Sequence, residues 1–305
     1  MIRSLHAWAS LMRLANGFTA LSNIFAGYFL VCFWMDRWFP FPYFLLAATL
    51  CFYYGGMILN DVFDYEVDCR ERPERMLPRG IINVGMARFL GFYLLICGMV
   101  FSWFQGDSSF YISLALALFI LIYNAMIKEG IAGSLIMGIC RYLNWLLGLS
   151  VALVAWNMED LRSVLSIVLI PVPVLLYVFS LTLLSKEESR ARHRWPLNLA
   201  AAGLVLTLAS AVLLHTRGIL PGWHGLILLC LLLSFLLYRL FRLSQRFEGS
   251  AIQGTIRLLV LGIIPLDALI VLSASYDSLT GSLAALVVLV LLIPARLLAG
   301  RFQVT

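Results

Sequence analysis

The sequence predicts an all-α protein built from nine or ten membrane-spanning helices. Hydrophobic residues make up 62% of the 305 residues and charged residues only 12%, whereas soluble domains carry roughly a quarter charged residues. The mean hydropathy is +0.94. A soluble protein with so few charges could not cover its surface, so most of the chain must face lipid or other buried segments. This composition excludes nucleic-acid-binding modules, secreted disulfide scaffolds and disordered tails as descriptions of the whole chain.

The apolar stretches are long enough to cross a membrane, which takes about 20 helical residues. Ten stretches qualify, namely 14–35, 41–60, 86–104, 109–127, 131–156, 163–184, 197–215, 224–241, 256–275 and 279–299. Only a short segment, 276–278, separates the last two, which leaves nine spans as the alternative. No polar stretch is long enough for a soluble domain, so we expect one integral-membrane domain over residues 1–305.

Positive charges fall mainly on one side of this layout. Eighteen of the 22 lysines and arginines lie on that side and three on the other, while Arg141 lies within a span. Basic residues concentrate in cytoplasmic loops of membrane proteins. We therefore predict that both termini and the loops 61–85 and 185–196 face the cytosol, and we expect a bacterial plasma membrane.

A group of acids follows the second span. If that helix continues beyond Asn60, then Asp61, Asp64 and Asp68 stand at positions i, i+3 and i+7 and share one face. Like charges on one face repel one another. A hard cation such as Mg²⁺, which takes carboxylate and phosphate oxygens together, is the usual reason to tolerate them. We predict these aspartates to be metal ligands and catalytic residues.

Three arginines follow the acids, interleaved with prolines that favour a compact loop. Arg72, Arg75 and Arg79 offer forked donors that suit phosphate oxygens. The alternative interpretation is a solvated helix end whose acids merely balance these arginines.

These two patterns resemble a known family. Asn60-Asp61-x-x-Asp64-x-x-x-Asp68, followed by Arg72-Pro73-x-Arg75-x-x-Pro78-x-Gly80, resembles the first aspartate-rich motif of UbiA-type intramembrane prenyltransferases. The resemblance extends to Arg13-x-x-Asn16 with Gly27, to Tyr123 with Lys128, and to Leu266-Asp267-Ala268. Within the family the chain is similar to the EboC-like branch in Gly138-x-Cys140-Arg141-x-x-Asn144-x-x-x-Gly148 and Ser185-x-x-Glu188.

The resemblance implies helices around a central cavity, with two acidic motifs that bind Mg²⁺ and a polyprenyl diphosphate at the cytosolic side. The prenyl group would pass to a small acceptor in the membrane, which we expect to be aromatic or a quinone precursor. The implied substrate-binding residues are Asn16, Asn60, Tyr123 and Lys128. A cytosolic anchor is the alternative interpretation of Lys128.

The second motif departs from the family pattern. Where two or three aspartates are usual, this chain has Ser185-Lys186-Glu187-Glu188-Ser189-Arg190. Adjacent residues of a helix point about 100° apart, so Glu187 and Glu188 cannot both line one face. One of them could still bind metal, so we predict Glu187 and Glu188 as candidate metal ligands, Glu188 as a catalytic residue, and Lys186 and Arg190 as phosphate contacts. A basic cytosolic loop with incidental acids is the alternative.

Two polar residues lie within the fifth span. Arg141 and Asn144 are three residues apart and so share a helix face. A charge at that depth usually faces a bundle interior or cavity. We favour a substrate-binding role for both residues, with a structural pair between Arg141 and Asp267 as the alternative.

Other functions fit the pattern less well. A UbiA-like protein without catalysis, which binds a lipid diphosphate and acts in metabolite carriage or export, is the main alternative. A CDP-alcohol phosphotransferase would need a glycine and an Ala-Arg pair around its acids, and Asp61-Val62-Phe63-Asp64 offers neither. An ordinary secondary transporter would not explain acids and arginines clustered at one end of a span.

Overall fold

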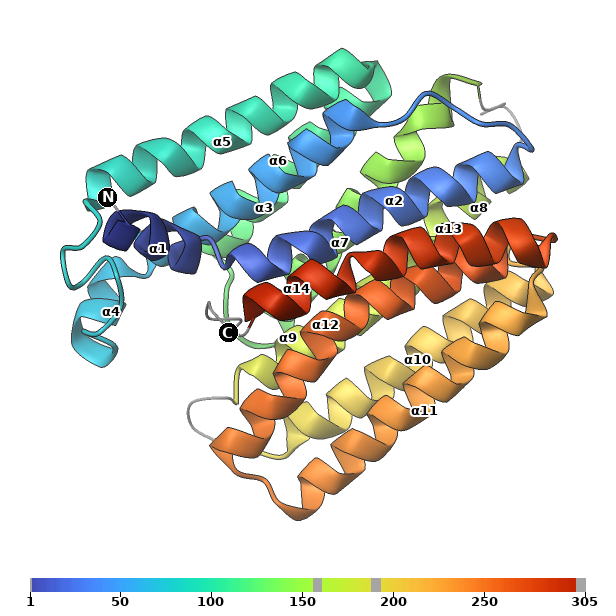
Figure 1. The fold of residues 1–305 in the computed structure, drawn as a ribbon. Coiled ribbons are helices and arrows are strands. Elements are labelled where there is room, and N and C mark those ends of the chain that lie inside the picture. Colours follow the sequence, from blue (N-terminus) through green and yellow to red (C-terminus); the bar gives the residue numbers. More distant parts are fainter. Residues whose placement is uncertain (1, 156–160, 188–192, 300–305) are drawn as a thin grey trace.

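Long helices lie side by side in the computed structural model of the chain (Figure 1), which describes residues 2–155, 161–187 and 193–299. These residues contain no β-strand. Within them, ten helical segments are long and apolar enough to cross a membrane, which confirms the predicted fold class and number of spans. The single-domain organisation over 1–305 stays a prediction.

The first half of the bundle contains α1 (Ile2–Leu11), η1 (Leu14–Asn16), α2 (Gly17–Trp34), α3 (Tyr43–Phe63), α4 (Tyr65–Glu71), α5 (Val84–Gln105), α6 (Asp107–Ala125) and α7 (Gly130–Leu149). The second half contains η2 (Ser150–Ala155), α8 (Leu161–Leu169), α9 (Val172–Ser185), α10 (Trp195–Thr216), α11 (Trp223–Gln245), α12 (Gly249–Ala274), α13 (Ser278–Val290) and α14 (Leu292–Ala299).

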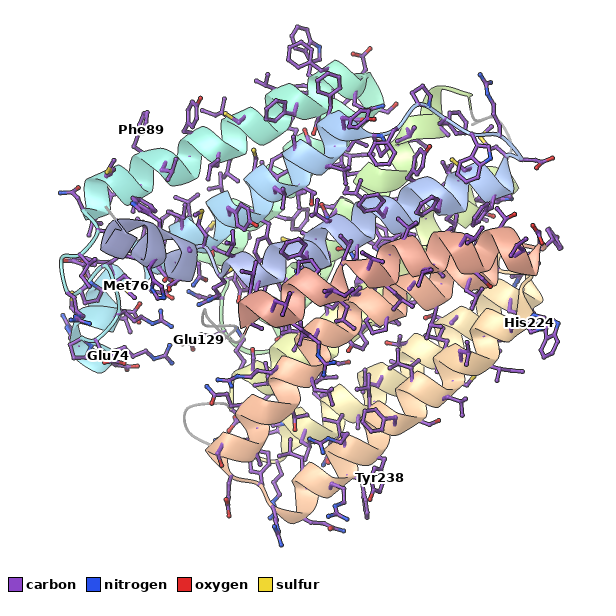
Figure 2. The ribbon with its side chains drawn as sticks, viewed as in Figure 1. Glu74, Met76, Phe89, Glu129, His224 and Tyr238 are labelled. Carbon is purple, nitrogen blue, oxygen red and sulfur yellow. The ribbon has the colours of Figure 1, made fainter. Side chains whose placement is uncertain are left out.

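The most buried spans are α2, α7, α9 and α12, which pack against one another. Outside them, α3 packs against α5, and α10 packs against α9 and α11. Apolar side chains on the outer helices point away from the bundle, as Phe89 on α5 and Tyr238 on α11 do in Figure 2. In a membrane these side chains contact lipid. The polar groups of the interior are therefore the candidates for a functional site.

Glycines allow two central helices to touch backbone to backbone. A Cβ atom added to Gly27 of α2 would lie 2.8 Å from the carbonyl carbon of Gly148 in α7. A Cβ on Gly148 would lie 2.8 Å from the carbonyl oxygen of Ile24. Small residues at such crossings let membrane helices associate by close van der Waals packing. The α2–α7 contact therefore depends on the absence of two side chains.

We expect Gly148→Ala to destabilise the protein by about 1–3 kcal/mol, because the added methyl group forces two backbones apart. The matched control is Gly254→Ala in α12, where an added Cβ meets no atom within 4 Å. That change should be neutral or stabilise by up to about 1 kcal/mol, since alanine is the better helix former. Thermal unfolding in detergent measures both, and equal effects would contradict the packing argument.

Three helices that the sequence predicts as continuous are interrupted. The predicted helix through Asp61, Asp64 and Asp68 is wrong in one respect, because α3 ends at Phe63 and α4 begins at Tyr65. Asp64 stands between them with φ −83° and ψ −3°, although the main-chain bond from its nitrogen to the Asn60 oxygen persists. The acids therefore lie on the last turn of the long helix α3, at the junction, and on the short helix α4.

Proline explains the other interruptions. The sixth predicted span is divided into α8 and α9 next to Pro171, and the tenth into α13 and α14 ahead of Pro294. Proline lacks the main-chain N–H that a continuous helix requires and its ring crowds the preceding turn.

The helix α1 was not predicted, because it is too short to span a membrane. Its Ala7 and Leu11 are buried in a cluster with Ile58 and Val62 of α3 and with Leu77. In Figure 1, α1, α4 and the end of α14 lie at the same end of the bundle. This end carries the acidic motif, and its cytosolic orientation stays a prediction from the charge distribution.

Candidate functional site

Three carboxylates meet where α3 leaves the bundle. Asp61 lies on the last turn of α3, Asp64 at the junction, and Asp68 on α4. Arg75 joins the first and the last, with its Nη1 atom 2.7 Å from Asp68 Oδ2 and 3.5 Å from Asp61 Oδ1. Burial raises the pKa of Asp68, and Arg75 opposes that shift. The loop arginine thus holds the acids together.

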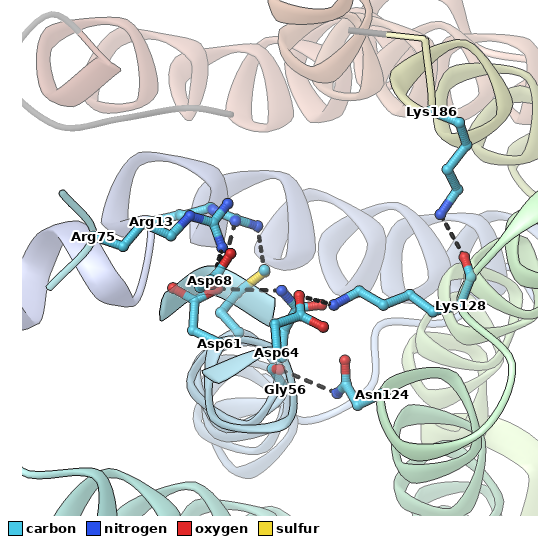
Figure 3. A network of polar contacts seen from close by, with 11 residues as sticks. Arg13, Gly56, Asp61, Asp64, Asp68, Arg75, Asn124, Lys128 and Lys186 are labelled. Carbon is cyan, nitrogen blue, oxygen red and sulfur yellow. Dashed lines mark hydrogen bonds and ion pairs between the residues drawn. The ribbon is translucent and has the colours of Figure 1, made fainter. Parts of the chain in front are cut away.

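A second arginine reaches the same cluster from the start of the first span. Arg13 has a positive φ of 48°, which is uncommon for a residue other than glycine. Its Nη2 atom lies 3.8 Å from Asp61 Oδ1 and its Nη1 atom 3.9 Å from Met57 Sδ. Figure 3 shows Arg13 and Arg75 on one side of the acids and Lys128 on the other.

Two lysines approach from the opposite side. Lys128, in the loop between α6 and α7, forms an ion pair with Asp64. Lys186 Nζ donates to the main-chain oxygen of Lys128 at 2.5 Å and lies 5.5 Å from the centre of the Tyr123 ring. Burial lowers the pKa of Lys128, and burial together with the charge of Lys128 lowers the pKa of Lys186 to about 8. The ends of α3, α6 and α9 therefore meet at one polar site.

A cavity extends from this polar site into the bundle. Its walls come from α2, α3, α6 and α7 and are mainly apolar, with Phe52, Leu116, Ile120 and Met137 among the lining residues. Its polar lining residues are Thr49, Tyr53, Asn60, Tyr123, Asn124, Arg141 and Asn144. The central cavity implied by the family resemblance is thus present, with polar groups at its mouth and in its inner wall.

Arg141 lies in that inner wall. Its Nη1 atom donates to Asn23 Oδ1 at 3.2 Å and its Nη2 atom to Thr19 Oγ1 at 2.9 Å. The guanidinium carbon stands 5.5 Å from the centre of the Tyr53 ring, within the range of a cation–π contact. Asn144 is held by Ala20, Asn23 and Thr49.

Asp267 is buried behind this wall. It accepts hydrogen bonds from Ser22 Oγ at 2.5 Å, Asn23 Nδ2 at 2.7 Å and Trp145 Nε1 at 2.9 Å. The amide of Asn23 stands between the two charges, since its nitrogen donates to Asp267 and its oxygen accepts from Arg141. The direct Arg141–Asp267 pair is therefore replaced by a bridge through Asn23, and Arg141 lines the cavity.

The remaining predicted site residues differ in their relation to the acids. Asn16 is buried at the start of the first span, and Asn60 donates to Asp61 Oδ1 at 3.2 Å. Arg72 and Arg79 form no ion pair with any residue that the structure describes. Glu187 is buried and accepts a hydrogen bond from the His193 main-chain nitrogen. Glu188 and Arg190 lie outside the described residues.

The donor set suits a magnesium ion that arrives with a phosphate ligand. Among the residues described, no three His, Cys, Asp or Glu side chains gather closely enough to form a metal cage by themselves. Mg²⁺ sites often use only one or two carboxylates, with waters and substrate phosphates completing the octahedron. Asp61 and Asp68, which share Arg75, and the neighbouring Asp64 meet that requirement.

Comparison with known proteins identifies the family of the chain. Residues 20–248 match the UbiA prenyltransferase family. The chain belongs to this family. As a UbiA family member with ten apolar spans, it is an integral, multi-pass membrane protein.

Several relatives of known name are archaeal. A digeranylgeranylglyceryl phosphate synthase of Metallosphaera sedula is 30% identical over 225 residues, which cover 72% of this chain and 71% of that protein. The synthase of Sulfurisphaera tokodaii is 32% identical over 145 residues, 46% of this chain. The chain spans about half the length of that relative, with 51% covered. The predicted bacterial plasma membrane finds no support in these archaeal relatives.

Solved UbiA-type structures share the fold. A structure described for digeranylgeranylglyceryl phosphate synthase in membranes superposes with a TM-score of 0.64 at 21% identity, covering 89% of this chain and 99% of that one. A UbiA homolog from Archaeoglobus fulgidus, bound to GPP and Mg²⁺, gives 0.65 at 11% identity, covering 90% and 99%. These likenesses show the fold alone.

Sequence reasoning missed several residues of the site, Arg13 and Asn124 among them. The sequence analysis named Arg13 only as part of the family resemblance and gave it no role at the site. Its approach to Asp61 depends on a left-handed backbone conformation that no sequence pattern predicts. Asn124 lines the cavity, and its position next to Tyr123 is the one signal that the sequence offers.

Proposed function

We propose that this UbiA family member catalyses Mg²⁺-dependent transfer of a polyprenyl group from a prenyl diphosphate to an acceptor in the membrane. The observation that carries the proposal is a cluster of three carboxylates and four basic side chains beside Asn60 and Tyr123, which line a mainly apolar cavity. A prenyl diphosphate combines a charged diphosphate, which suits the charged cluster, with a hydrocarbon chain, which suits the apolar cavity. Its chain gains roughly 0.8 kcal/mol per buried methylene group.

Each group has a role in this scheme. Asp61, Asp64 and Asp68 would hold Mg²⁺, with Glu187 and Glu188 as further ligands. Bound Mg²⁺ supplies Lewis-acid stabilisation of the leaving diphosphate. Basic and amide side chains would bind and orient the phosphate oxygens, as preorganised electrostatic stabilisation requires. We assign this role to Asn16, Asn60, Arg72, Arg75, Arg79, Lys128, Lys186 and Arg190, with Tyr123, Arg141 and Asn144 lining the prenyl or acceptor cavity.

The names of the relatives favour a glycerophosphate-type lipid as acceptor. A synthase of digeranylgeranylglyceryl phosphate joins a geranylgeranyl group to a glyceryl phosphate that offers a free hydroxyl. We therefore propose geranylgeranylglyceryl phosphate as the first acceptor to test, ahead of the aromatic or quinone-precursor acceptor expected from the sequence. The likeness to the EboC-like branch, like the cytosolic orientation of the site, stays a prediction.

A protein that binds a lipid diphosphate without catalysis is the second candidate. Glu187 of the second acidic motif favours this candidate, because its carboxylate already accepts a hydrogen bond from the main-chain nitrogen of His193. A lysine, Lys186, extends instead from the end of α9 to the main-chain oxygen of Lys128, whose side chain pairs with Asp64. Such a protein would carry or export a metabolite.

The first experiment incubates purified protein with geranylgeranyl diphosphate, Mg²⁺ and either geranylgeranylglyceryl phosphate or 4-hydroxybenzoate. We expect a prenylated product with the glycerophosphate lipid, and none when a chelator replaces Mg²⁺. Thermal unfolding is measured in parallel, since a ligand at a hundred times its dissociation constant stabilises the folded state by about 2.7 kcal/mol. Stabilisation without product from either acceptor would support the carrier instead, and neither effect would contradict the diphosphate site.

A further inference from the structure

Asn124, a residue of the cavity lining, has an unused hydrogen-bond acceptor. It lies one residue before the end of α6, is 7% exposed and belongs to the cavity lining. Its Nδ2 atom donates to the main-chain oxygen of Gly56 in α3 at 3.2 Å. Its Oδ1 atom is buried and has no hydrogen-bond partner among the residues that the structure describes.

The contact with Gly56 fixes the orientation of the Asn124 amide. A main-chain carbonyl accepts hydrogen bonds and cannot donate them, so the nitrogen of Asn124 must face Gly56. In Figure 3 the Asn124 oxygen points away from Gly56, on the side where Asp64 and Lys128 lie. Buried polar atoms are nearly always paired, because leaving one unpaired forfeits its hydration. The Oδ1 atom can therefore accept a hydrogen bond from a donor group of a bound ligand.

The two proposed substrates differ in whether they offer that donor. An ionised prenyl diphosphate presents oxygens that accept hydrogen bonds, and its chain is hydrocarbon. A glycerophosphate lipid with a free hydroxyl presents an O–H group. An amide oxygen below the acidic cluster is thus matched to the second substrate and not to the first.

We infer that Asn124 Oδ1 binds the nucleophilic hydroxyl of the acceptor and holds it beside the diphosphate site. This inference rests on the proposed function. In the reaction, the hydroxyl oxygen bonds to C1 of the prenyl group, and the bond from C1 to the diphosphate oxygen breaks with its electron pair on the diphosphate. The hydroxyl proton leaves with the diphosphate. An amide is too weak a base to take that proton, so Asn124 orients the hydroxyl.

The test compares geranylgeranylglyceryl phosphate with its deoxy analogue, in which hydrogen replaces the free hydroxyl. Binding to the full-length protein is measured by thermal shift with Mg²⁺ present. The wild type should bind the hydroxyl-bearing lipid about tenfold more tightly, the usual size of one net hydrogen bond. Asn124→Leu, which is close in size but accepts no hydrogen bond, should bind both lipids equally. Asn198→Leu on the exposed face of α10 is the matched control and should keep the wild-type preference.

Kinetics give a second measurement. For Asn124→Leu we expect kcat/KM for the glycerophosphate lipid to fall about tenfold, while stabilisation by geranylgeranyl diphosphate with Mg²⁺ is unchanged. A wild type that binds the two lipids equally would overturn the inference, and this comparison requires no variant to fold. Loss of diphosphate binding in Asn124→Leu would also overturn it. A wild type that prefers the hydroxyl but forms no product would refute only the proposed transferase.

Discussion

Replacing Asp64 by asparagine should lower prenyl transfer by about 10²–10³-fold, the range typical for removing one preorganised electrostatic group. Asp64 stands where α3 and α4 meet and forms an ion pair with Lys128. The variant keeps the shape of the side chain but removes a charged oxygen from the proposed Mg²⁺ ligands. It also leaves Lys128 without its acidic partner. We expect stabilisation by geranylgeranyl diphosphate to become insensitive to Mg²⁺.

The fold itself should tolerate this change. The two side chains of the pair are 26% and 27% exposed, and ion pairs near a surface contribute about 1 kcal/mol or less. Glu66→Gln removes an exposed carboxylate from α4 in the same stretch and serves as the control. Rates of product formation and ligand-free unfolding temperatures are compared for both variants. If Glu66→Gln lost as much activity as Asp64→Asn, the specific role of Asp64 would be refuted.

Removing Asp267 should produce the largest loss of stability. Its carboxylate accepts three hydrogen bonds in the middle of the bundle and faces Arg141 through Asn23. Asp267→Leu leaves the donors of Trp145 and Asn23 without an acceptor and the half-buried guanidinium of Arg141 without its counter-charge. Breaking a buried pair by removing one partner typically costs about 3–5 kcal/mol. Unfolding in detergent should show a loss of that size.

A double-mutant cycle separates the charge coupling from the local packing. Arg141→Met alone should also destabilise the protein, and the double variant should lose clearly less than the sum of the two singles, because neither charge is then left unbalanced. Asp36→Asn is the control. Asp36 is exposed and has a φ of 45°, a conformation that asparagine accepts equally well. Strict additivity of the two single effects would show that Asn23 does not couple the charges.

Much of this protein was predictable from local sequence. Length and hydropathy predict ten spans, because each helix must satisfy its own main-chain hydrogen bonds in lipid and therefore leaves a contiguous apolar stretch. The acids and the loop arginines occupy one short segment, so their spacing alone indicates a common site. The family likeness rests on the same residues. The proline-induced interruptions of α8–α9 and α13–α14 were also within reach of the sequence, since Pro171 and Pro294 are visible in it.

Contacts between distant segments were decided only by the tertiary structure. Arg13 meets Asp61 across 48 positions, and Lys186 reaches Lys128 across 58. The bridge from Asp267 to Arg141 requires Asn23, an unremarkable residue of an apolar helix. That Asn124 Oδ1 has no hydrogen-bond partner among the described residues follows only from the packing of its amide against Gly56. Hydropathy reports how each residue partitions into lipid, whereas hydrogen bonds among buried side chains depend on which helix faces meet. That information lies in the packing and not in any single segment.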